Sequence, residues 1–570
     1  MCPSTPAAAW VRRVAVLVTV IVAAERLRAL LRAPPTDFDD AYMFLRYAHN
    51  LIAGFGLRWN RGEPPVYGAT SLPHVAVVAF FRALSARLSD AAALQLASGV
   101  AAAALLIALA LTSARFARQP ALRGQPWVWA ALLLPLLAYS EPFRFHAHTG
   151  MDTMLAALAN TVLVYAALAL AEAPDGRRAL AAAVAAVAAY LAYLVRPDNL
   201  VYAALVPALC LLLDGPAGRR TRALIVFAAA LLSLVSVDLV VKQRLLGSAL
   251  PLGAYAKRPW HYAGFVGEFT WNPFWFLRVF LGALWPMLAA LVLCAGRRSG
   301  RLVAALLLPA GLGLAAFFGV NQIMGHLGRF LFPALPFFVV SAALAVDRAL
   351  PPPLHALGRA PALAPASPSR AVLLTARLGA AVALLLGGGW ALNRAGARYD
   401  ARAATQALAS LGGFTVAARE PPPELDSWRS SEEMAVFARA APAGARFAMS
   451  EHGLVGARAP DAVIIDLLGL HDPVFARAPF RAAELWRRDP DVIWMPHPDH
   501  TQMVRDILDS DELWTRYDFY PDLFSYGVAV RREGDGPRAA ALASIWRARC
   551  AASYPGLALD AYRARRAGAP

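Results

Sequence analysis

Residues 223–241 read ALIVFAAALLSLVSVDLVV, an apolar run long enough to cross a lipid bilayer as a helix. Such a helix needs about 20 mainly apolar residues. Of the 570 residues, 58% are hydrophobic and 16% are charged, whereas soluble domains carry roughly 25% charged residues. The sequence therefore predicts a mainly α, polytopic membrane bundle of about eleven spans, at 14–32, 92–112, 127–140, 152–171, 179–195, 200–213, 223–241, 275–295, 302–320, 329–346 and 372–390.

The net charge of +17 is distributed as in a membrane protein. Residues 391–570 hold 22 basic and 23 acidic side chains, so the whole excess lies in the first 390 residues. Arginines are concentrated in every second loop, for example Arg12–Arg13 and Arg219–Arg220, as the positive-inside rule predicts. We therefore expect an inner-membrane protein with a cytoplasmic N-terminus and an extracytoplasmic C-terminal domain. No nucleic-acid partner is expected, because no basic stripe on a folded domain is visible.

The chain divides at about residue 390 into a membrane domain, 1–390, and a soluble domain, 391–570. Within the first, 33–91 forms the first external loop, provided that the interrupted apolar stretch 73–89 lies at the membrane surface rather than spanning it. The second reads as an α/β domain. Short apolar runs bounded by Gly, Pro and Asp predict strands at 446–450, 462–466 and 491–495, with helical patterns between them.

The first external loop carries the most informative polar block, Asp39-Asp40-Ala41-Tyr42 followed by Arg46-Tyr47-Ala48-His49-Asn50. Apolar residues at helical spacing predict a helix over 41–53, with Asp39 and Asp40 at its start. A helix N-terminus favours carboxylates, and one Asp would suffice as a cap. Two adjacent carboxylates also hinder each other's ionisation, which suits one of them to act as a general base.

This block resembles the first external loop of the GT-C glycosyltransferases, in the group that contains the cell-wall arabinofuranosyltransferases. Further resembling elements follow in order along most of the chain. They are Gly54-Phe-Gly56-Leu-Arg-Trp-Asn60, Tyr67-Gly68-Ala69-Thr70-Ser71, Thr149-Gly150-Met151-Asp152-Thr153, Arg196-Pro197-Asp198, Leu250-Pro251 with Tyr255-Ala256-Lys257, Arg329-Phe330-Leu331-Phe332-Pro333 and Asp466-Leu-Leu-Gly469-Leu-His471-Asp472-Pro473.

The resemblance implies transfer of a sugar from a polyprenyl-phosphate donor to a glycan or other cell-envelope acceptor outside the membrane. Asp39 or Asp40, with Asp39 narrowly favoured, would be the general base for an inverting attack by the acceptor hydroxyl. Fixed cations would stabilise the departing lipid phosphate. The residues concerned are Arg196, Lys257 and Arg329 for the donor phosphate, and Tyr42, Arg46, Asp152 and Asp198 for substrate binding.

Simpler explanations remain open for several of these residues. Arg196 and Arg329 could anchor spans at the membrane surface, and Lys257 could solvate a loop. Asp152 and Asp198 could cap helices. A divalent metal is possible, and His146 with His148 could form a metal pair, but no cofactor is certain. Two other functional classes are a lipid-linked sugar flippase, which would normally show internal repeats, and a membrane-anchored scaffold.

Overall fold

The computed structural model describes residues 6–350 except 86, 120–121, 214–216, 258–271, 297–298 and 319–325, and residues 412–566 except 419, 421 and 424. The chain forms two compact units, each built from separated segments. The first comprises Met1–Thr36, Gln95–Val237 and Thr270–Ala397, and the second comprises Asp37–Leu94, Asp238–Phe269 and Arg398–Pro570. The segment 37–94 therefore folds with the C-terminal region, and the functional boundary near residue 390 stays a prediction.

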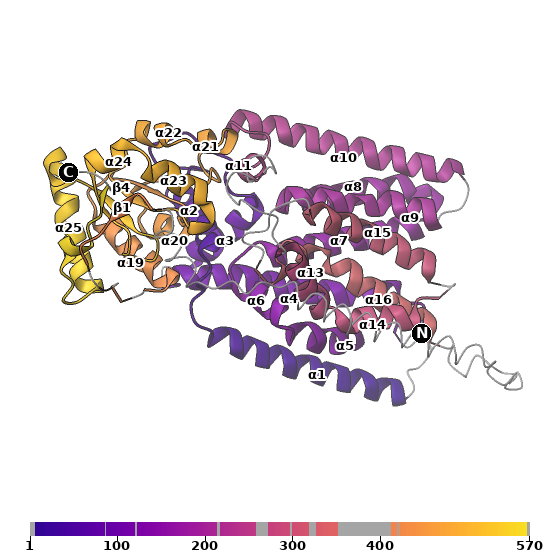
Figure 1. Cartoon of the computed structure of the whole chain (residues 1–570). Helices are drawn as coiled ribbons and strands as arrows, with labels where there is room; N and C mark the ends of the chain where they lie inside the picture. The colour runs from indigo at the N-terminus through magenta and orange to yellow at the C-terminus, as the bar shows by residue number, and fades with distance from the viewer. Residues whose placement is uncertain are drawn as a thin grey trace, which may run out of the picture. The chain divides into compact units, whose positions relative to one another are not determined.

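The first unit is helical throughout its described residues (Figure 1). Its elements are α1 (Pro6–Leu31), most of α4 (Asp90–Phe116), α5 (Pro126–Ala138), α6 (Glu141–His148), α7 (Thr153–Glu172), η1 (Asp175–Arg177), α8 (Arg178–Val195), η2 (Pro197–Ala204), α9 (Leu205–Leu213), most of α10 (Ala217–Leu246), α13 (Asn272–Ala283), α14 (Trp285–Cys294), α15 (Gly300–Phe318), η3 (His326–Gly328), η4 (Phe332–Ala334) and α16 (Leu335–Ala349).

Among the described residues, six helices are long and apolar enough to cross a membrane, or seven if the broken pair α13–α14, bent by 71°, is one span. The protein is thus an integral membrane protein, as predicted. The expected spans at 127–140 and 200–213 correspond to shorter helices, Pro126–Ala138 and Pro197–Leu213. The span expected at 372–390 lies outside the described residues, so a total of eleven stays a prediction.

Small side chains let the helices of the first unit approach closely. Ala182, Ala185 and Ala189 of α8 are buried in the same core as Ala157 and Val164 of α7. In a membrane, where lipid is as apolar as leucine, close packing of small residues is a main source of helix association. By contrast, only 6% of the most apolar stretch of α10 is buried, as expected for a helix that faces lipid.

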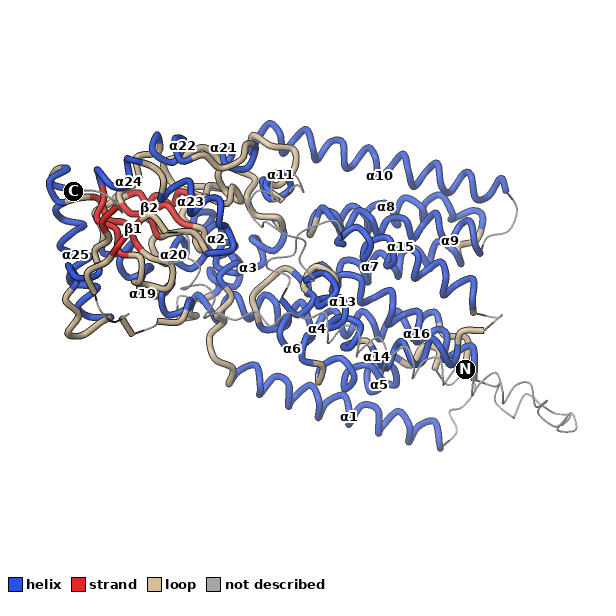
Figure 2. The backbone as a smooth tube through the Cα atoms, viewed as in Figure 1, coloured by secondary structure: helices blue, strands red, loops and turns tan. Residues whose placement is uncertain are grey.

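The second unit is an α/β structure (Figure 2). Its helices are α2 (Asp39–Ile52), α3 (Leu72–Leu84), α11 (Leu252–Ala256), α19 (Ser427–Ala440), α20 (Gly453–Arg458), α21 (Pro473–Arg477), α22 (Ala482–Arg487), η6 (Pro498–His500), α23 (Thr501–Leu508), α24 (Asp511–Arg516), η7 (Glu533–Asp535), α25 (Pro537–Ser553) and η8 (Leu559–Tyr562). Its strands are β1 (Phe414–Thr415), β2 (Arg446–Met449), β3 (Val463–Asp466), β4 (Val492–Trp494), β5 (Tyr517–Tyr520), β6 (Val528–Arg531) and β7 (Arg565–Arg566).

Five of these strands form one sheet in the order β3-β2-β4-β6-β5. Strand β2 runs parallel to both β3 and β4, whereas β6 pairs antiparallel with β4 and β5. The predicted strands at 446, 462 and 491 are β2, β3 and β4, and the predicted C-terminal α/β region is confirmed. Strand β2 therefore lies between β3 and β4 in the sheet. The carboxyl ends of such parallel strands are where α/β sheets usually bind ligands.

Candidate functional site

The acidic pair begins helix α2, as the sequence predicts, but the two carboxylates differ in role. Asp39 Oδ2 accepts a hydrogen bond of 2.8 Å from the Gly453 amide, and its Oδ1 accepts one of 2.8 Å from the Leu454 amide. Asp39 therefore caps the start of α20, more than 400 residues further along the chain. Position 453 must be glycine for this approach, because a Cβ there would overlap the backbone carbonyl of Asp39.

The pKa of Asp39 lies above the usual carboxyl value. Burial raises this pKa. The hydrogen bond from Leu454, the charge of His452 and the hydrogen bond from Gly453 each lower it, but together by less. The neighbouring charge of Asp40 raises it further. The effect of Asp40 on the pKa of Asp39 has the sign expected of adjacent carboxylates. A carboxylate whose pKa is raised holds a proton more readily, which a general base requires.

Arg46 is the most completely engaged side chain of α2. Its side chain is buried, with 1% of its surface exposed. Nε donates to Trp59 O at 2.6 Å, and Nη2 donates to Asn60 Oδ1 at 2.8 Å and Ala462 O at 3.0 Å. Nη1 donates to the carbonyls of Gly456 and Ala459, at the end of α20.

All five N–H donors of this guanidinium therefore have protein acceptors. Burial lowers the pKa of Arg46 to about 9, so the group stays protonated at neutral pH. These contacts give Arg46 a structural role, and we leave it out of the proposed substrate site. Tyr42, the other substrate residue predicted on this helix, is also fully buried, with its ring 5.8 Å from that of Trp428.

A second polar cluster lies in the first unit, where α8 ends and η2 begins. Arg196 Nη2 lies 2.8 Å from Asp198 Oδ2 and its Nε lies 3.1 Å from Asp198 Oδ1, a two-point ion pair. Arg196 Nη1 lies 3.7 Å from Asp152 Oδ1. Asp152 and Arg196 are buried, with 1% and 6% of their surfaces exposed. The structure thus brings together three of the predicted residues, and it gives Arg196 carboxylate partners that the sequence did not reveal.

Arg329 belongs to the same cluster. The guanidinium carbons of Arg196 and Arg329 lie 5.6 Å and 5.2 Å from the centre of the Phe330 ring. Two residues before Arg329, Leu327 has φ 49, a left-handed conformation that is uncommon outside glycine and costs roughly 1–3 kcal/mol. The Leu327 carbonyl lies 3.1 Å from His146 Nε2. Local strain held by a buried contact beside two cations is typical of functional sites.

The remaining predicted residues do not all join this cluster. Lys257 follows α11 and belongs to the second unit, as do Asp39 and Asp40. His146 Nε2 lies 3.1 Å from Leu327 O and His148 Nε2 lies 3.0 Å from Pro34 O, so the suggested metal pair of these two histidines stays a prediction. The predicted residues therefore form two groups. One is built around Arg196 and Arg329, and the other around the acidic pair.

The sequence analysis missed one buried ion pair. Lys242 Nζ lies 2.6 Å from Asp238 Oδ2, one turn apart on α10, and 4.9 Å from the centre of the Tyr67 ring. Tyr67 opens the Tyr67–Ser71 turn, and its carbonyl accepts a hydrogen bond of 2.7 Å from the Leu252 amide. An Asp and a Lys at i and i+4 within an otherwise apolar run are the sequence signal that could have revealed the pair.

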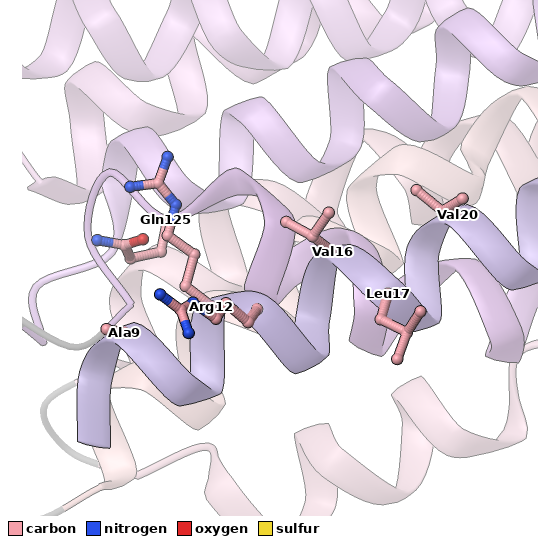
Figure 3. Close-up of a pocket in the computed structure, with 7 residues that line it drawn as sticks. Ala9, Arg12, Val16, Leu17, Val20 and Gln125 are labelled. Atoms are coloured by element: carbon pink, nitrogen blue, oxygen red, sulfur yellow. The ribbon is translucent and has the colours of Figure 1, made fainter. Parts of the chain in front are cut away.

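A pocket of about 590 Å³ lies along the first helix, lined by Ala9, Arg12, Arg13, Val16, Leu17, Val20 and Gln125. Figure 3 shows the side chains of Arg12 and Gln125 at one end of this pocket and those of Leu17 and Val20 at the other. None of the predicted site residues lines it. Because its walls offer cations and apolar groups but no carboxylate, it provides no general base for the predicted chemistry.

The chain thus has a bundle of apolar, membrane-length helices and an α/β unit that includes residues 37–94. The structure is similar to that of ArnT from Cupriavidus metallidurans in the apo state, with a TM-score of 0.50 and 16% sequence identity over 94% of this chain and 100% of that chain.

A weaker similarity is to the same ArnT bound to undecaprenyl phosphate, with a TM-score of 0.49 and 15% identity over 91% of this chain and 99% of that chain. Another is to the apo oligosaccharyltransferase of Archaeoglobus fulgidus, with a TM-score of 0.40 and 14% identity over 93% of this chain and 75% of that chain. Residues 423–538 match a domain of unknown function, DUF8728. No curated protein matches the chain.

Proposed function

We propose that this protein is a membrane glycosyltransferase that moves a sugar from polyprenyl phosphate to a hydroxyl of a glycan or other cell-envelope acceptor on the outer face of the membrane. The observation that carries the proposal is the pair Asp39–Asp40 at the start of α2, in a chain with the fold of ArnT. The pair is more than a cap requires, and Asp39 accepts hydrogen bonds from the first two amides of α20.

The proposed reaction is a single displacement at the anomeric carbon. A carboxylate of the pair takes the proton of the acceptor hydroxyl, whose oxygen then forms a bond to the anomeric carbon. The bond from that carbon to the phosphate oxygen breaks, and its electron pair leaves with the lipid phosphate. A direct attack of this kind inverts the anomeric configuration. The departing phosphate needs no general acid, because its oxygen is a stable anion.

Different roles for Asp39 and Asp40 are supported by the hydrogen bonds of Asp39. Both oxygens of Asp39 accept backbone hydrogen bonds, which hold its carboxylate in one orientation and occupy the oxygens that would otherwise take the proton of the acceptor hydroxyl. We therefore assign proton transfer to Asp40, and to Asp39 the positioning of α2 and the electrostatic tuning of its neighbour. The sequence had narrowly favoured Asp39 as the base, because Asp39 comes first in the pair. This proposal reverses that preference.

The donor phosphate would be bound by Arg196, Arg329 and Lys257. Arg196 is paired with Asp198 and lies close to Asp152, so two carboxylates offset much of its charge. Arg329 shares the Phe330 ring with it, and a guanidinium group matches the geometry of phosphate oxygens, although Nε and Nη2 of Arg196 already donate to Asp198. Asp152 and Asp198 then serve to orient Arg196, in place of the direct substrate contacts that the sequence predicted.

Purified protein incubated with radiolabelled polyprenyl-phosphate sugars and a panel of glycan acceptors tests the proposal. Asp40→Asn should lower the rate of transfer by about 10²–10⁴-fold, the usual contribution of a general base. Asp37→Asn, an exposed carboxylate of the same loop, is the matched control and should retain the wild-type rate. Donor binding, measured separately, should persist in Asp40→Asn.

Two results would overturn the assignment. Wild-type transfer by Asp40→Asn with loss of transfer in a folded Asp39→Asn would return the base to Asp39. Movement of labelled donor across proteoliposome membranes, without formation of a glycosidic bond to any acceptor, would identify a flippase instead.

A further inference from the structure

Three chemistry-bearing side chains of the second unit gather at the carboxyl ends of two parallel strands. Strands β2 and β3 pair in register, with Met449 opposite Asp466, the last residue of β3. His452 follows three residues after Met449 and precedes the first residue of α20. His471 returns to the same place through the Asp466–Pro473 motif, because its amide donates a hydrogen bond of 2.6 Å to Asp466 Oδ2.

These side chains are buried and mutually close. His452, Asp466 and His471 expose 2%, 0% and 4% of their surfaces, and one potential ligand atom from each lies within 4.8 Å of the other two. It is the only group of three or more His, Cys, Asp or Glu side chains with this geometry among the residues that the structure describes. Asp466 is thus a buried carboxylate with two imidazole rings beside it.

The His452 ring has its Nδ1 3.6 Å from Asp466 Oδ1, and its Nε2 has no hydrogen-bond partner within the described part of the chain. Its Nδ1 donates a hydrogen bond of 2.7 Å to the Ser450 carbonyl, so the proton lies on Nδ1 and the lone pair on Nε2. The Nε2 atom is fully buried. Metal-binding histidines usually donate the other ring N–H to a carbonyl or carboxylate, as this one does. A buried nitrogen without a partner calls for an explanation, and coordination of a metal ion would provide one.

The surroundings hold the other two ligands in place. Asp466 Oδ1 accepts a hydrogen bond of 2.9 Å from the Leu468 amide, which orients the carboxylate. The His471 ring stacks on Trp59 at 3.9 Å between ring centres, with 9° between the planes. Its Nδ1 lies 3.1 Å from the Tyr47 hydroxyl and its Nε2 lies 2.9 Å from Met43 Sδ. Binding an ion would exchange one of these two contacts for a coordinate bond, and Tyr47 or Met43 would then become part of the outer shell.

We infer that His452, Asp466 and His471 bind a divalent transition-metal ion, and that zinc fits the site best. Two imidazole nitrogens and one carboxylate oxygen form a common zinc ligand set, with the fourth tetrahedral position left to water. Hard cations such as Mg²⁺ and Ca²⁺ prefer sites made mainly of oxygen, which this is not. With bonds of about 2 Å, a tetrahedral ion would draw the three ligand atoms to about 3.3 Å from one another.

The proposed ion would stabilise the second unit rather than take part in sugar transfer. Its ligands come from the loops after β2 and β3, and His471 contacts α2 through Tyr47 and Met43. The ion would thus fix the Asp466–Pro473 motif, for which the proposed transfer reaction has no use. This inference does not depend on the proposed transfer activity, because it can be tested by metal content and spectroscopy alone.

The first experiment measures bound metal in full-length protein purified in detergent. After dialysis against a weak chelator, elemental analysis should find about one equivalent of zinc per chain. His452→Gln, Asp466→Asn and His471→Gln should each lose it, with affinity falling by more than the roughly 10–100-fold that outer-shell changes cost. His497→Gln, which changes a histidine of the same unit outside the group, should keep a full equivalent.

The second experiment needs no variant, and therefore decides the matter even if the substituted proteins fail to fold. Wild-type protein stripped by a strong chelator is titrated with Co²⁺, which absorbs strongly in the visible range when tetrahedral. Saturation at one equivalent, displaced by Zn²⁺, is the expected result, together with a rise in thermal unfolding temperature on metal addition. No cobalt spectrum and no effect of zinc on unfolding would overturn the inference, as would zinc retained unchanged by all three ligand variants.

Discussion

Arg46 offers the sharpest test of how the second unit is held together. Its guanidinium joins α2 to the carbonyls of Gly456, Ala459 and Ala462, which lie more than 400 residues away in the chain. Arg46→Met keeps most of the side-chain volume and removes every donor. The carbonyls of Gly456 and Ala462 then lose the donor that Arg46 supplies, and each unsatisfied buried carbonyl costs about 1–3 kcal/mol.

The expected loss of stability for Arg46→Met is therefore about 2–6 kcal/mol. For a unit of this size each kcal/mol shifts the unfolding temperature by about 2–4 °C, so the second unit should melt roughly 5–20 °C lower. Arg46→Lys keeps the charge and at most three donors, and should fall between the wild type and Arg46→Met. Thermal unfolding of the full chain in detergent, followed by fluorescence of the buried Trp59, Trp494 and Trp546, measures the shift.

Arg61→Met is the matched control. Arg61 also links the segment 37–94 to the C-terminal segment, through an ion pair of 2.5 Å with Asp461, but 71% of the Asp461 side chain is exposed. Exposed ion pairs contribute about 0–1 kcal/mol, so this variant should melt close to the wild type. Equal melting temperatures for Arg46→Met and Arg61→Met would refute the claim that Arg46 holds the unit together.

Three further predictions concern the same unit. Asp39→Asn offers one acceptor oxygen where Asp39 uses two, and should lower stability by about 1.5–3 kcal/mol in the same melting assay; an unchanged melting temperature would contradict the capping of α20 by Asp39. Gly453→Ala places a Cβ against the Asp39 carbonyl and should cost about 1–3 kcal/mol, while Gly534→Ala, with open space around it, should not; equal effects would contradict the close approach. Burial lowers the pKa of His500 to about 3, so this histidine stays neutral in the folded state while the unfolded chain takes up a proton below about pH 6.5. Stability should therefore fall as the pH drops from about 6.5 towards 3, by up to about 1.4 kcal/mol per pH unit, and His500→Gln should flatten that slope in acid-unfolding curves.

Local patterns in the sequence predict the elements well. The apolar runs around 92–112, 152–171 and 179–195 are membrane-length helices, and β2, β3 and β4 start within one residue of their predicted positions. The GT-C resemblance, carried by ordered short motifs, agrees with the fold of ArnT. Each of these features depends on residues that are neighbours in the chain, where periodicity and turn residues are informative.

The sequence is less informative about contacts between distant segments. Arg46 reads as a substrate residue because its motif is polar, and only the structure shows that its donors end on the carbonyls around α20. His452 belongs to no motif, and its place beside Asp466 depends on the register of β2 with β3. The partners of Arg196 were equally hidden, because Asp152 lies a whole helical hairpin away.

The second unit is built from segments that are far apart in the chain, and this affects how the protein folds during synthesis. Arg46 leaves the ribosome 410 residues before Gly456, whose carbonyl it must meet. At about 5–20 residues per second, translation alone separates the two by roughly 20–80 s. Throughout that interval the segment 37–94 is already synthesised, while the C-terminal residues that contact its aromatic and cationic side chains are not. A nascent chain stalled before residue 446 should therefore carry a protease-sensitive first loop, and mutations near the C-terminus should expose a segment that was translated almost at the start.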